Sequence, residues 1–267
     1  MGERLAVYRH LITASIRSQL AYPTSFALQC AGQAVVQLED MVVILVLFSR
    51  IGAMGGFTRF EVLLIFSLAG VSFGLADLLV GSLNKIGELV RTGTLDALLL
   101  RPVPAMVQIC TSEFALRRLG KVVTALAVLG YVLATSHISW NPLRVAVLLI
   151  TPVTGLVLFG AMWVTATATS FWLIEGEELP NAVTYGSSLF TSYPVSVFSG
   201  WLLRLVALYG SGGFVAYYPA LAILGKPDPL GLPAVLPYSA PVVAILTTGA
   251  AALAWRAGLR HYVGTGS

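Results

Sequence analysis

Long apolar stretches alternate with short charged or proline-rich stretches along the whole chain. Each apolar stretch is about long enough for a helix to cross a bilayer, which takes about 20 residues. The strict alternation of apolar and polar positions that is typical of membrane β-barrels is absent. The pattern therefore predicts an all-α polytopic membrane protein. Its six transmembrane helices are expected at 24–49, 60–83, 119–138, 143–172, 184–209 and 234–259.

Two segments outside these six stretches also have recognisable patterns. Residues 1–22 place apolar side chains every three or four positions opposite Arg4, Arg9 and Arg17, which predicts an amphipathic helix in the membrane interface, ended by Pro23. The remaining chain, 23–267, then forms the six-helix transmembrane domain. Within it, prolines interrupt the apolar stretch of 210–233, which predicts an outer re-entrant segment shielded by protein.

The charged loop 84–104, between the second and third predicted spans, has its own helix signals. Gly93 can end one helix in a left-handed conformation, and Thr94 can cap a second helix with Asp96 in its first turn. Arg101 precedes a proline and should leave the helical conformation. A short amphipathic helix in this loop is compatible with two roles: a docking site for another protein, or a passive contact with the lipid headgroups. Its apolar face consists of Leu95, Leu98 and Leu99.

Polar side chains gather in the first and fifth predicted spans. In the first span they recur every three or four positions and so share one helical face, and in the fifth span hydroxyls are frequent and Pro194 should kink the helix. Such groups are costly in a membrane and face the protein interior or a wet cavity. They fit hydrogen bonds between packed helices or the wall of a transport path or subunit seam. The face in the first span is Ser25, Gln29, Gln33, Gln37 and Asp40, and the hydroxyls in the fifth are Thr184, Ser187, Ser188, Thr191, Ser192, Ser196 and Ser199.

Composition and charge agree with a membrane protein and set its orientation. Of the 267 residues, 57% are hydrophobic and only 10% charged, against about 25% charged in soluble domains. The net charge of +4 is a topology signal here and not evidence for nucleic acid. With both termini in the cytosol, the basic residues of the inner segments far outnumber those of the outer ones, so loop 84–104 is expected in the cytosol. The inner set is Arg4, Arg9, Arg17, Lys85, Arg91, Arg101, Arg117, Arg118, Lys121, Arg256 and Arg260, and the outer set is Arg50, Arg59, Arg144 and Lys226.

Motifs for catalysis or cofactor binding are missing from the sequence. The Gly-Lys pairs at Lys121 and Lys226 lack the Ser or Thr of a Walker A motif, and no nucleophile elbow or zinc-protease motif occurs. Cys30 and Cys110 follow no metal or redox spacing. We therefore expect no catalytic residue, no metal and no cofactor bound by this chain.

Several strings resemble the type-2 ABC exporter permeases. The string from Gly93 to Pro102 is similar to the G-x-L-D-x-x-L-x-R-P signature of one bacterial branch, whose members usually work as permease pairs. Ser192-Tyr193-Pro194 and Tyr217-Tyr218-Pro219-Ala220 resemble later motifs of that branch, and the likeness covers essentially the whole chain. Residues 209–213 differ from the usual start of the outer segment in that branch. The resemblance therefore does not determine the shape of the outer gate.

The resemblance implies a complex in the bacterial cytoplasmic membrane. Two permeases, identical or related, would join two copies of an ABC ATP-binding subunit that carries ATP and Mg, and the complex would export a substrate. The first and fifth helices of the two permeases would enclose the path. The implied coupling helix comprises Gly93, Thr94, Leu95, Asp96, Leu98, Leu99 and Arg101. The implied path or dimer seam comprises Gln29, Gln33, Gln37, Asp40, Ser188, Thr191, Ser192 and Ser196, and the implied outer gate comprises Tyr217, Tyr218 and Pro219.

Two other functions fit the residues. A secondary transporter that works without an ATPase would use Asp40 and Asp77 as proton or ion sites, although the inverted repeat expected of such a protein is not seen between the two halves. A membrane-embedded enzyme acting on lipid is a third hypothesis. The identity of the substrate is not readable from the sequence.

Overall fold

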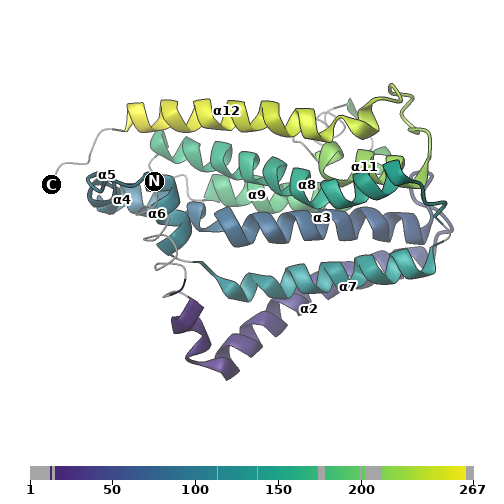
Figure 1. Cartoon of the computed structure of the whole chain (residues 1–267), viewed down its shortest axis with the longest axis horizontal. Coiled ribbons are helices and arrows are strands. Elements are labelled where there is room, and N and C mark those ends of the chain that lie inside the picture. The colour runs from purple at the N-terminus through teal and green to yellow at the C-terminus, as the bar shows by residue number, and fades with distance from the viewer. Residues whose placement is uncertain are drawn as a thin grey trace.

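The helices of this protein lie roughly side by side in an elongated bundle, with α2 crossing the others obliquely (Figure 1). The computed structural model describes residues 13, 16–112, 114–136, 138–173, 178–198, 200–201 and 212–262. The regular elements of this part of the chain are helical, apart from one isolated bridge between Met54 and Phe57. Among the described residues, five helical segments are long and apolar enough to cross a membrane: Pro23–Phe48, Arg59–Arg91, Leu116–Thr135, Pro142–Phe171 and Ala240–His261. The chain is therefore a multi-pass membrane protein.

Helix α3 (Arg59–Val80) is the centre of the bundle. It packs between α7 (Leu119–Thr135) and α8 (Pro142–Ala168), while α2 (Pro23–Phe48) packs on α7 and α12 (Ala240–His261) packs on α8 (Figure 1). In its most apolar stretch, the segment that begins with α3 has 89% of its residues buried, whereas α2 has 11%. Most of the surface of α2 must therefore be covered by lipid or by another subunit.

The two ends of the bundle carry different short elements. Helices α4 (Ile86–Arg91), α5 (Thr94–Leu99) and α6 (Ala105–Ser112) lie together where α3 ends, and we call this the α5 end (Figure 1). Helix α11 (Tyr218–Leu224) follows a π-helical turn, η5 (Gly213–Tyr217), towards the opposite end, which we call the α11 end. The short η1 (Gly81–Lys85) joins α3 to α4, and η2 (Leu116–Arg118) precedes α7.

The segment Gly213–Leu224 is a short apolar helix that is almost completely buried. Gly225 ends it with a φ of 69°, a left-handed conformation that glycine adopts without steric cost. Prolines then keep the chain irregular, and α12 begins at Ala240, not near residue 234 as the apolar pattern indicates. Pro241 lies in the first turn of α12, where its missing N–H leaves no helical hydrogen bond unmade.

The fifth predicted span differs from the sequence prediction. Helix α9 (Glu178–Thr191) ends before Pro194, whose extended backbone leads into η4 (Val195–Val197). Pro194 thus interrupts the helix where a kink was expected, because proline lacks the N–H that continues a helix and clashes with the preceding turn. Residues 202–211 are outside the described part, so the predicted count of six spans is not confirmed.

Other predictions fall partly or wholly outside the described residues. These are most of the interfacial helix 1–22, the hydroxyl residue Ser199 and the first part of the outer segment, 210–211. Helix α2 does begin at Pro23, where the predicted interfacial helix was expected to end. Proline suits this position because its fixed φ matches the first turn of a helix.

Candidate functional site

A tight reversal of the backbone brings α5 back against α4. Gly93 lies between the two helices with a φ of 68°, so the predicted left-handed glycine is confirmed. The predicted cap at Thr94 is wrong, because the left-handed Gly93 itself occupies the N-cap position and Thr94 is already the first helical residue. The Thr94 hydroxyl instead lies 2.8 Å from the hydroxyl of Thr92, which donates to the carbonyl of Glu88.

The leucines of α5 divide between the protein interior and the surface. Leu95 is fully buried in the hydrophobic core, and the partly buried Leu98 packs against that core. Leu99 is 43% exposed and Leu100, directly after the helix, is 88% exposed. The expected common face of Leu95, Leu98 and Leu99 is therefore split. Leu95 anchors the helix, while Leu99, Leu100 and the exposed Arg101 form a surface at the α5 end.

Gln108 of α6 holds the end of α5 in place. Its amide Nε2 donates to the carbonyls of Leu98 at 2.9 Å and Val103 at 2.7 Å. The last carbonyls of a helix have no partner within the helix, so a side chain from elsewhere must satisfy them. Gln108 is nearly buried and carries no local sequence signal for this role.

The carboxylate of Asp96, in the first turn of α5, lies beside Tyr262 at the end of α12. Burial, and then the nearby Asp96, raise the pKa of the Tyr262 hydroxyl. The Tyr262 ring also packs edge-on against Phe171, with 6.1 Å between the ring centroids. The short helix α5 thereby lies against the end of α12, a contact that has no signal in the local sequence.

Asp77 joins α3 to α7 through buried charge pairs. Its side chain is 2% exposed, and its Oδ1 lies 3.1 Å from Nε of Arg118 while its Oδ2 lies 3.7 Å from Nζ of Lys121. Arg118 also donates from Nη1 to the backbone carbonyl of Asp77 at 2.8 Å. The carboxylate is therefore compensated by two cations from the beginning of α7.

An aromatic cluster extends from this ion pair to the loop 84–104. The ammonium of Lys121 lies 5.3 Å from the ring centre of Phe73 and 5.5 Å from that of Tyr185, within the range of cation–π attraction. The ring of Trp163 stacks on Phe73 and meets Tyr185 edge-on. Its indole N–H donates to Oδ1 of Asn84 at 2.6 Å. Asn84 begins the loop 84–104, so these contacts connect that loop to α7 and α9.

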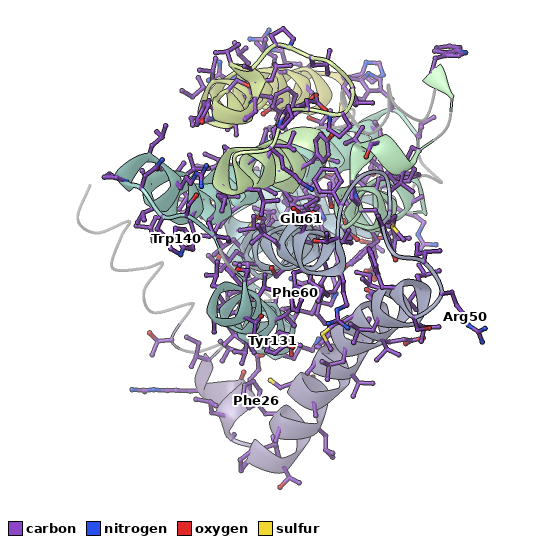
Figure 2. All side chains as sticks on the ribbon, turned by 90° about the vertical axis from the view of Figure 1, so that its right-hand side faces the viewer. Phe26, Arg50, Phe60, Glu61, Tyr131 and Trp140 are labelled. Carbon is purple, nitrogen blue, oxygen red and sulfur yellow. The ribbon has the colours of Figure 1, made fainter. Side chains whose placement is uncertain are left out.

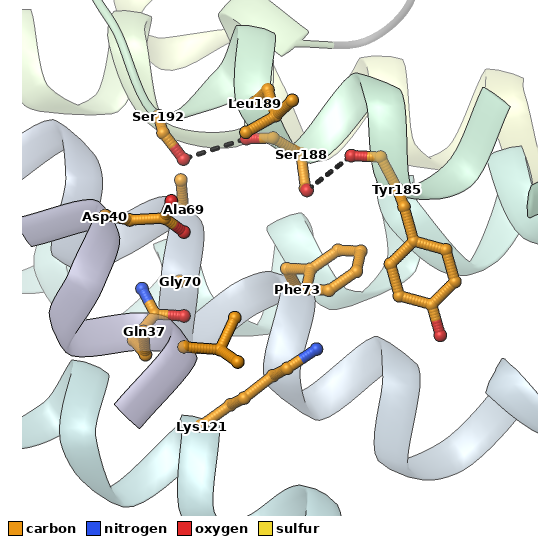
Figure 3. Close-up of a pocket in the computed structure, with 11 residues that line it drawn as sticks. Gln37, Asp40, Ala69, Gly70, Phe73, Lys121, Tyr185, Ser188, Leu189 and Ser192 are labelled. Carbon is orange, nitrogen blue, oxygen red and sulfur yellow. Dashed lines mark hydrogen bonds between the residues drawn. The ribbon is translucent and has the colours of Figure 1, made fainter. Parts of the chain in front are cut away.

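A polar cavity of about 270 Å³ lies between α2, α3, α7 and α9 (Figure 3). Ser192 donates from its hydroxyl to the carbonyl of Ser188, and Ser188 donates to the carbonyl of Tyr185, so α9 satisfies these hydroxyls itself. Asp40 has no ion pair or hydrogen bond to any other residue that the structure describes. The polar lining is Gln37, Asp40, Lys121, Tyr185, Ser188 and Ser192, and Phe73 supplies an aromatic face.

Four of the eight residues assigned to a path or seam meet in this cavity: Gln37, Asp40, Ser188 and Ser192. Two of the other four lie elsewhere along α2. Gln29 is exposed and donates to Ser25, and Gln33 lies against the close approach of Gly120. The polar face of α2 therefore turns inward only from Gln33 onwards.

The remaining two are in and after α9. Thr191 is buried and donates to the carbonyl of Ser188, whereas Ser196 donates to the carbonyl of Gly55 at 2.7 Å near the α11 end. Lys121, Phe73 and Tyr185 line the cavity but were not predicted to do so. Their charge, aromatic character and spacing in the sequence could not identify them as lining one cavity, because the three residues belong to three separate helices.

The residues of the expected outer gate are buried near the α11 end. The Tyr217 hydroxyl donates to Asp228 at 2.8 Å, and the rings of Tyr217 and Tyr218 meet edge-on. Near this group, Lys226 donates to Glu61 at 2.7 Å and to the carbonyl of Gly56 at 3.1 Å. Pro219 is also buried, so this group is closed by side-chain contacts.

Comparison with protein-family models gives a match over residues 34–266, which reach from the first half of α2 past the end of α12. The matching model is described as "ABC-2 family transporter protein". No curated protein and no solved structure matches this chain.

Proposed function

This chain belongs to the ABC-2 transporter family and is a type-2 ABC permease, and we propose that it is the permease subunit of an ATP-driven exporter in a bacterial cytoplasmic membrane. Membership implies a membrane subunit that is generally not catalytic itself, together with an ABC ATP-binding partner and a bilayer. In the proposed complex, two ATP-binding subunits carry ATP and Mg, and a second permease, identical or related, completes the path.

This proposal rests mainly on how α5 is held in place and on the leucines that it leaves exposed. Helix α5 is anchored by the buried Leu95 and fixed at its end by Gln108, while Leu99 and Leu100 remain exposed. Exposed leucines on a positioned helix fit a contact with a protein groove, because burying apolar side chains stabilises such an interface. We assign α5 as the coupling helix, with Gly93, Thr94, Asp96 and Arg101 completing it. The excess of basic residues at this end supports its placement, and that of both termini, in the cytosol.

The polar cavity supports a path between two permeases. It is lined from α2 and α9, and α2 leaves most of its surface uncovered. Glu39, in the middle of α2, is exposed on the side away from the core. Because a carboxylate facing lipid is costly, a second permease covering this face would account for it. We propose that Gln37, Asp40, Ser188 and Ser192 line the path, with Gln29, Gln33 and Thr191 along the seam and Ser196 near its outer end.

The proposed mechanism uses the contacts of α5 and of the loop before it. ATP binding would close the two ATP-binding subunits and displace α5, to which Asp96 and Tyr262 connect α12. The displacement would also reach the cavity through the bond from Trp163 to Asn84. Such coupling requires that the two nucleotide states hold α5 differently. The opening of Tyr217, Tyr218 and Pro219 would then release substrate on the outer side.

The ion pairs of Asp77 argue against the alternative of a secondary transporter. That hypothesis needs Asp77 to exchange a proton or an ion, but the carboxylate already faces Arg118 and Lys121. A transported cation would have to displace one of these two side chains from the carboxylate.

Site-specific cross-linking tests the proposed contact. In a background with Cys30→Ser and Cys110→Ser, Leu100→Cys is expected to cross-link to a co-expressed ABC ATP-binding subunit. Leu173→Cys is the matched control, because Leu173 is an exposed leucine outside α5 that follows η3 (Thr169–Phe171), a turn that packs against α4. Cross-linking at Leu173 alone, or at neither position in an assembled complex, would contradict the assignment of α5.

A further inference from the structure

A second cavity, of about 510 Å³, lies between α2, α3 and α7 on the other flank of α2. Its α2 residues, Leu38, Met41 and Leu45, are three and four positions apart and therefore form one stripe. The polar cavity is lined by Gln37 and Asp40, which lie on the opposite flank of the buried face of α2. This second cavity, which we call the α2–α7 groove, is therefore separate from the proposed path.

The α2–α7 groove is open to the side of the bundle. Leu63 and Val128 form a buried floor, whereas Leu38 and Ala127 on the two walls are exposed. The lining is apolar apart from Arg59, Thr124 and Tyr131. A groove with apolar walls on the side of a membrane-spanning bundle faces the acyl chains of the bilayer.

A cation lies at the mouth of the α2–α7 groove. Arg59 is the first residue of α3, at the α11 end, where the helix leaves the membrane core, and its guanidinium lies 4.9 Å from the ring centre of Phe60. Among the residues that the structure describes, no carboxylate pairs with it, because the nearby Glu61 is bound by Lys226. Figure 2, which looks onto this end, shows Phe60 on α3 and Tyr131 on the neighbouring α7. Tyr131 is 57% exposed, and tyrosine is enriched at the level of lipid headgroups.

We propose that the α2–α7 groove binds a phospholipid with an anionic headgroup, whose phosphate lies on Arg59 and one of whose acyl chains lies in the groove. The guanidinium presents paired N–H donors that match a phosphate. The wall from Leu45 to Leu38 is about 10 Å long at 1.5 Å per residue, so the chain reaches from the headgroup level towards the middle of the bilayer. Tyr131 offers its hydroxyl to the same headgroup. This inference does not depend on the proposed function.

The test is lipid binding by the full-length protein, purified in a non-ionic detergent and delipidated. Phosphatidylglycerol and, separately, phosphatidylcholine with the same acyl chains are titrated in, and bound lipid is counted by native mass spectrometry. The wild type is expected to bind one phosphatidylglycerol more tightly than phosphatidylcholine. Arg59→Gln should weaken binding of phosphatidylglycerol about tenfold, as expected for a lost charge-assisted hydrogen bond. It should also remove most of the preference over phosphatidylcholine, whose quaternary ammonium already compensates its phosphate. The matched control is Arg50→Gln, since Arg50 is an exposed arginine at the same end that does not line the groove.

A second variant tests the acyl-chain part of the site. Ala127→Phe fills the groove from its exposed wall and should reduce the binding of both lipids, whereas Val123→Phe, on an exposed position of α7 outside the groove, should not. Equal binding of the two lipids by the wild type, or an equal effect of Arg50→Gln and Arg59→Gln, would overturn the proposal. So would an unchanged lipid count in Ala127→Phe together with a loss of dimer, since that result would assign the groove to a second copy of the chain.

Discussion

Asp77 is the residue on which the charge balance inside this bundle depends. It is nearly inaccessible, and it faces the guanidinium of Arg118 and the ammonium of Lys121. Removing one partner of a buried ion pair leaves the remaining charge uncompensated, which is more damaging than losing an exposed pair. Asp77 therefore contributes to stability. Its partner Lys121 also lines the polar cavity, so the same cluster of charges borders that cavity.

We predict that Asp77→Asn lowers the free energy of unfolding by about 3 kcal/mol, because two cations then share a buried site without a carboxylate. Lys121→Met should have a smaller effect, since Asp77 keeps its pair with Arg118. Thermal unfolding of the purified variants in one detergent measures both changes. Equal losses for the two variants, or none for Asp77→Asn, would show that the cluster is not arranged as described.

Cys110 of α6 gives a prediction that depends on pH. Burial raises the pKa of its thiol to about 11, against a smaller lowering by Arg118. Because the thiolate is the reactive form, only about one thousandth of Cys110 is reactive at pH 8. In a Cys30→Ser background, the rate of alkylation should rise about tenfold per pH unit from pH 8 to pH 10. A rate that reaches its plateau below pH 9 would mean that the thiol is not buried in α6.

At the scale of the element, the α4–α5 reversal could be predicted well from local sequence. Gly93 was expected in a left-handed conformation because few other residues tolerate it, and it adopts one. The cap at Thr94 was predicted wrongly, because a threonine directly after such a glycine is already inside the helix. The bond from Trp163 to Asn84 joins residues 79 positions apart and carries no local signal.

We predict that Gly93→Ala destabilises the α4–α5 reversal by about 1 kcal/mol, since alanine is strained at a positive φ. Gly130→Ala is the control, because Gly130 lies inside α7 with open space around it and alanine favours a helix. Hydrogen exchange of the amides of α5 measures the local effect. If α5 exchanges no faster in Gly93→Ala than in Gly130→Ala, the reversal does not depend on the glycine.

Trp163→Phe tests the connection between the loop 84–104 and the aromatic cluster. Phenylalanine keeps an aromatic ring beside Phe73 and Tyr185 but cannot donate to Asn84. We expect faster amide exchange in α4 and a loss of at least about 1 kcal/mol in stability, because one hydrogen bond contributes about that much and the smaller ring also leaves unfilled space in the core. Asn84→Ala in the Trp163→Phe background should then add little to the loss. Full additivity of the two changes would contradict a direct bond between them.

At the scale of the whole molecule, the class of the protein could be predicted from the sequence, but the arrangement of its helices could not. The apolar stretches and the string around Gly93 indicated a type-2 ABC permease, and the family comparison agrees. The meeting of Gln37 and Asp40 with Ser188 and Ser192 depends on how α2 and α9 are placed around α3, which periodicity within one helix does not determine. The break at Pro194 likewise replaced a continuous fifth helix, because η4 and its bond from Ser196 to Gly55 hold the chain in another direction.

We propose that α5 transmits the work of a separate ATP-binding subunit to this bundle. The most direct test is the rate of ATP hydrolysis by the assembled complex in liposomes that carry Leu99→Asp and Leu100→Asp, compared with Leu173→Asp. Charges at the centre of a protein contact cost more than about 1.4 kcal/mol, which is tenfold in affinity. We expect hydrolysis to fall at least about tenfold in the α5 variant and to stay near the wild-type rate in Leu173→Asp. A wild-type rate in the α5 variant, with both kinds of subunit present in the liposomes, would contradict the claim.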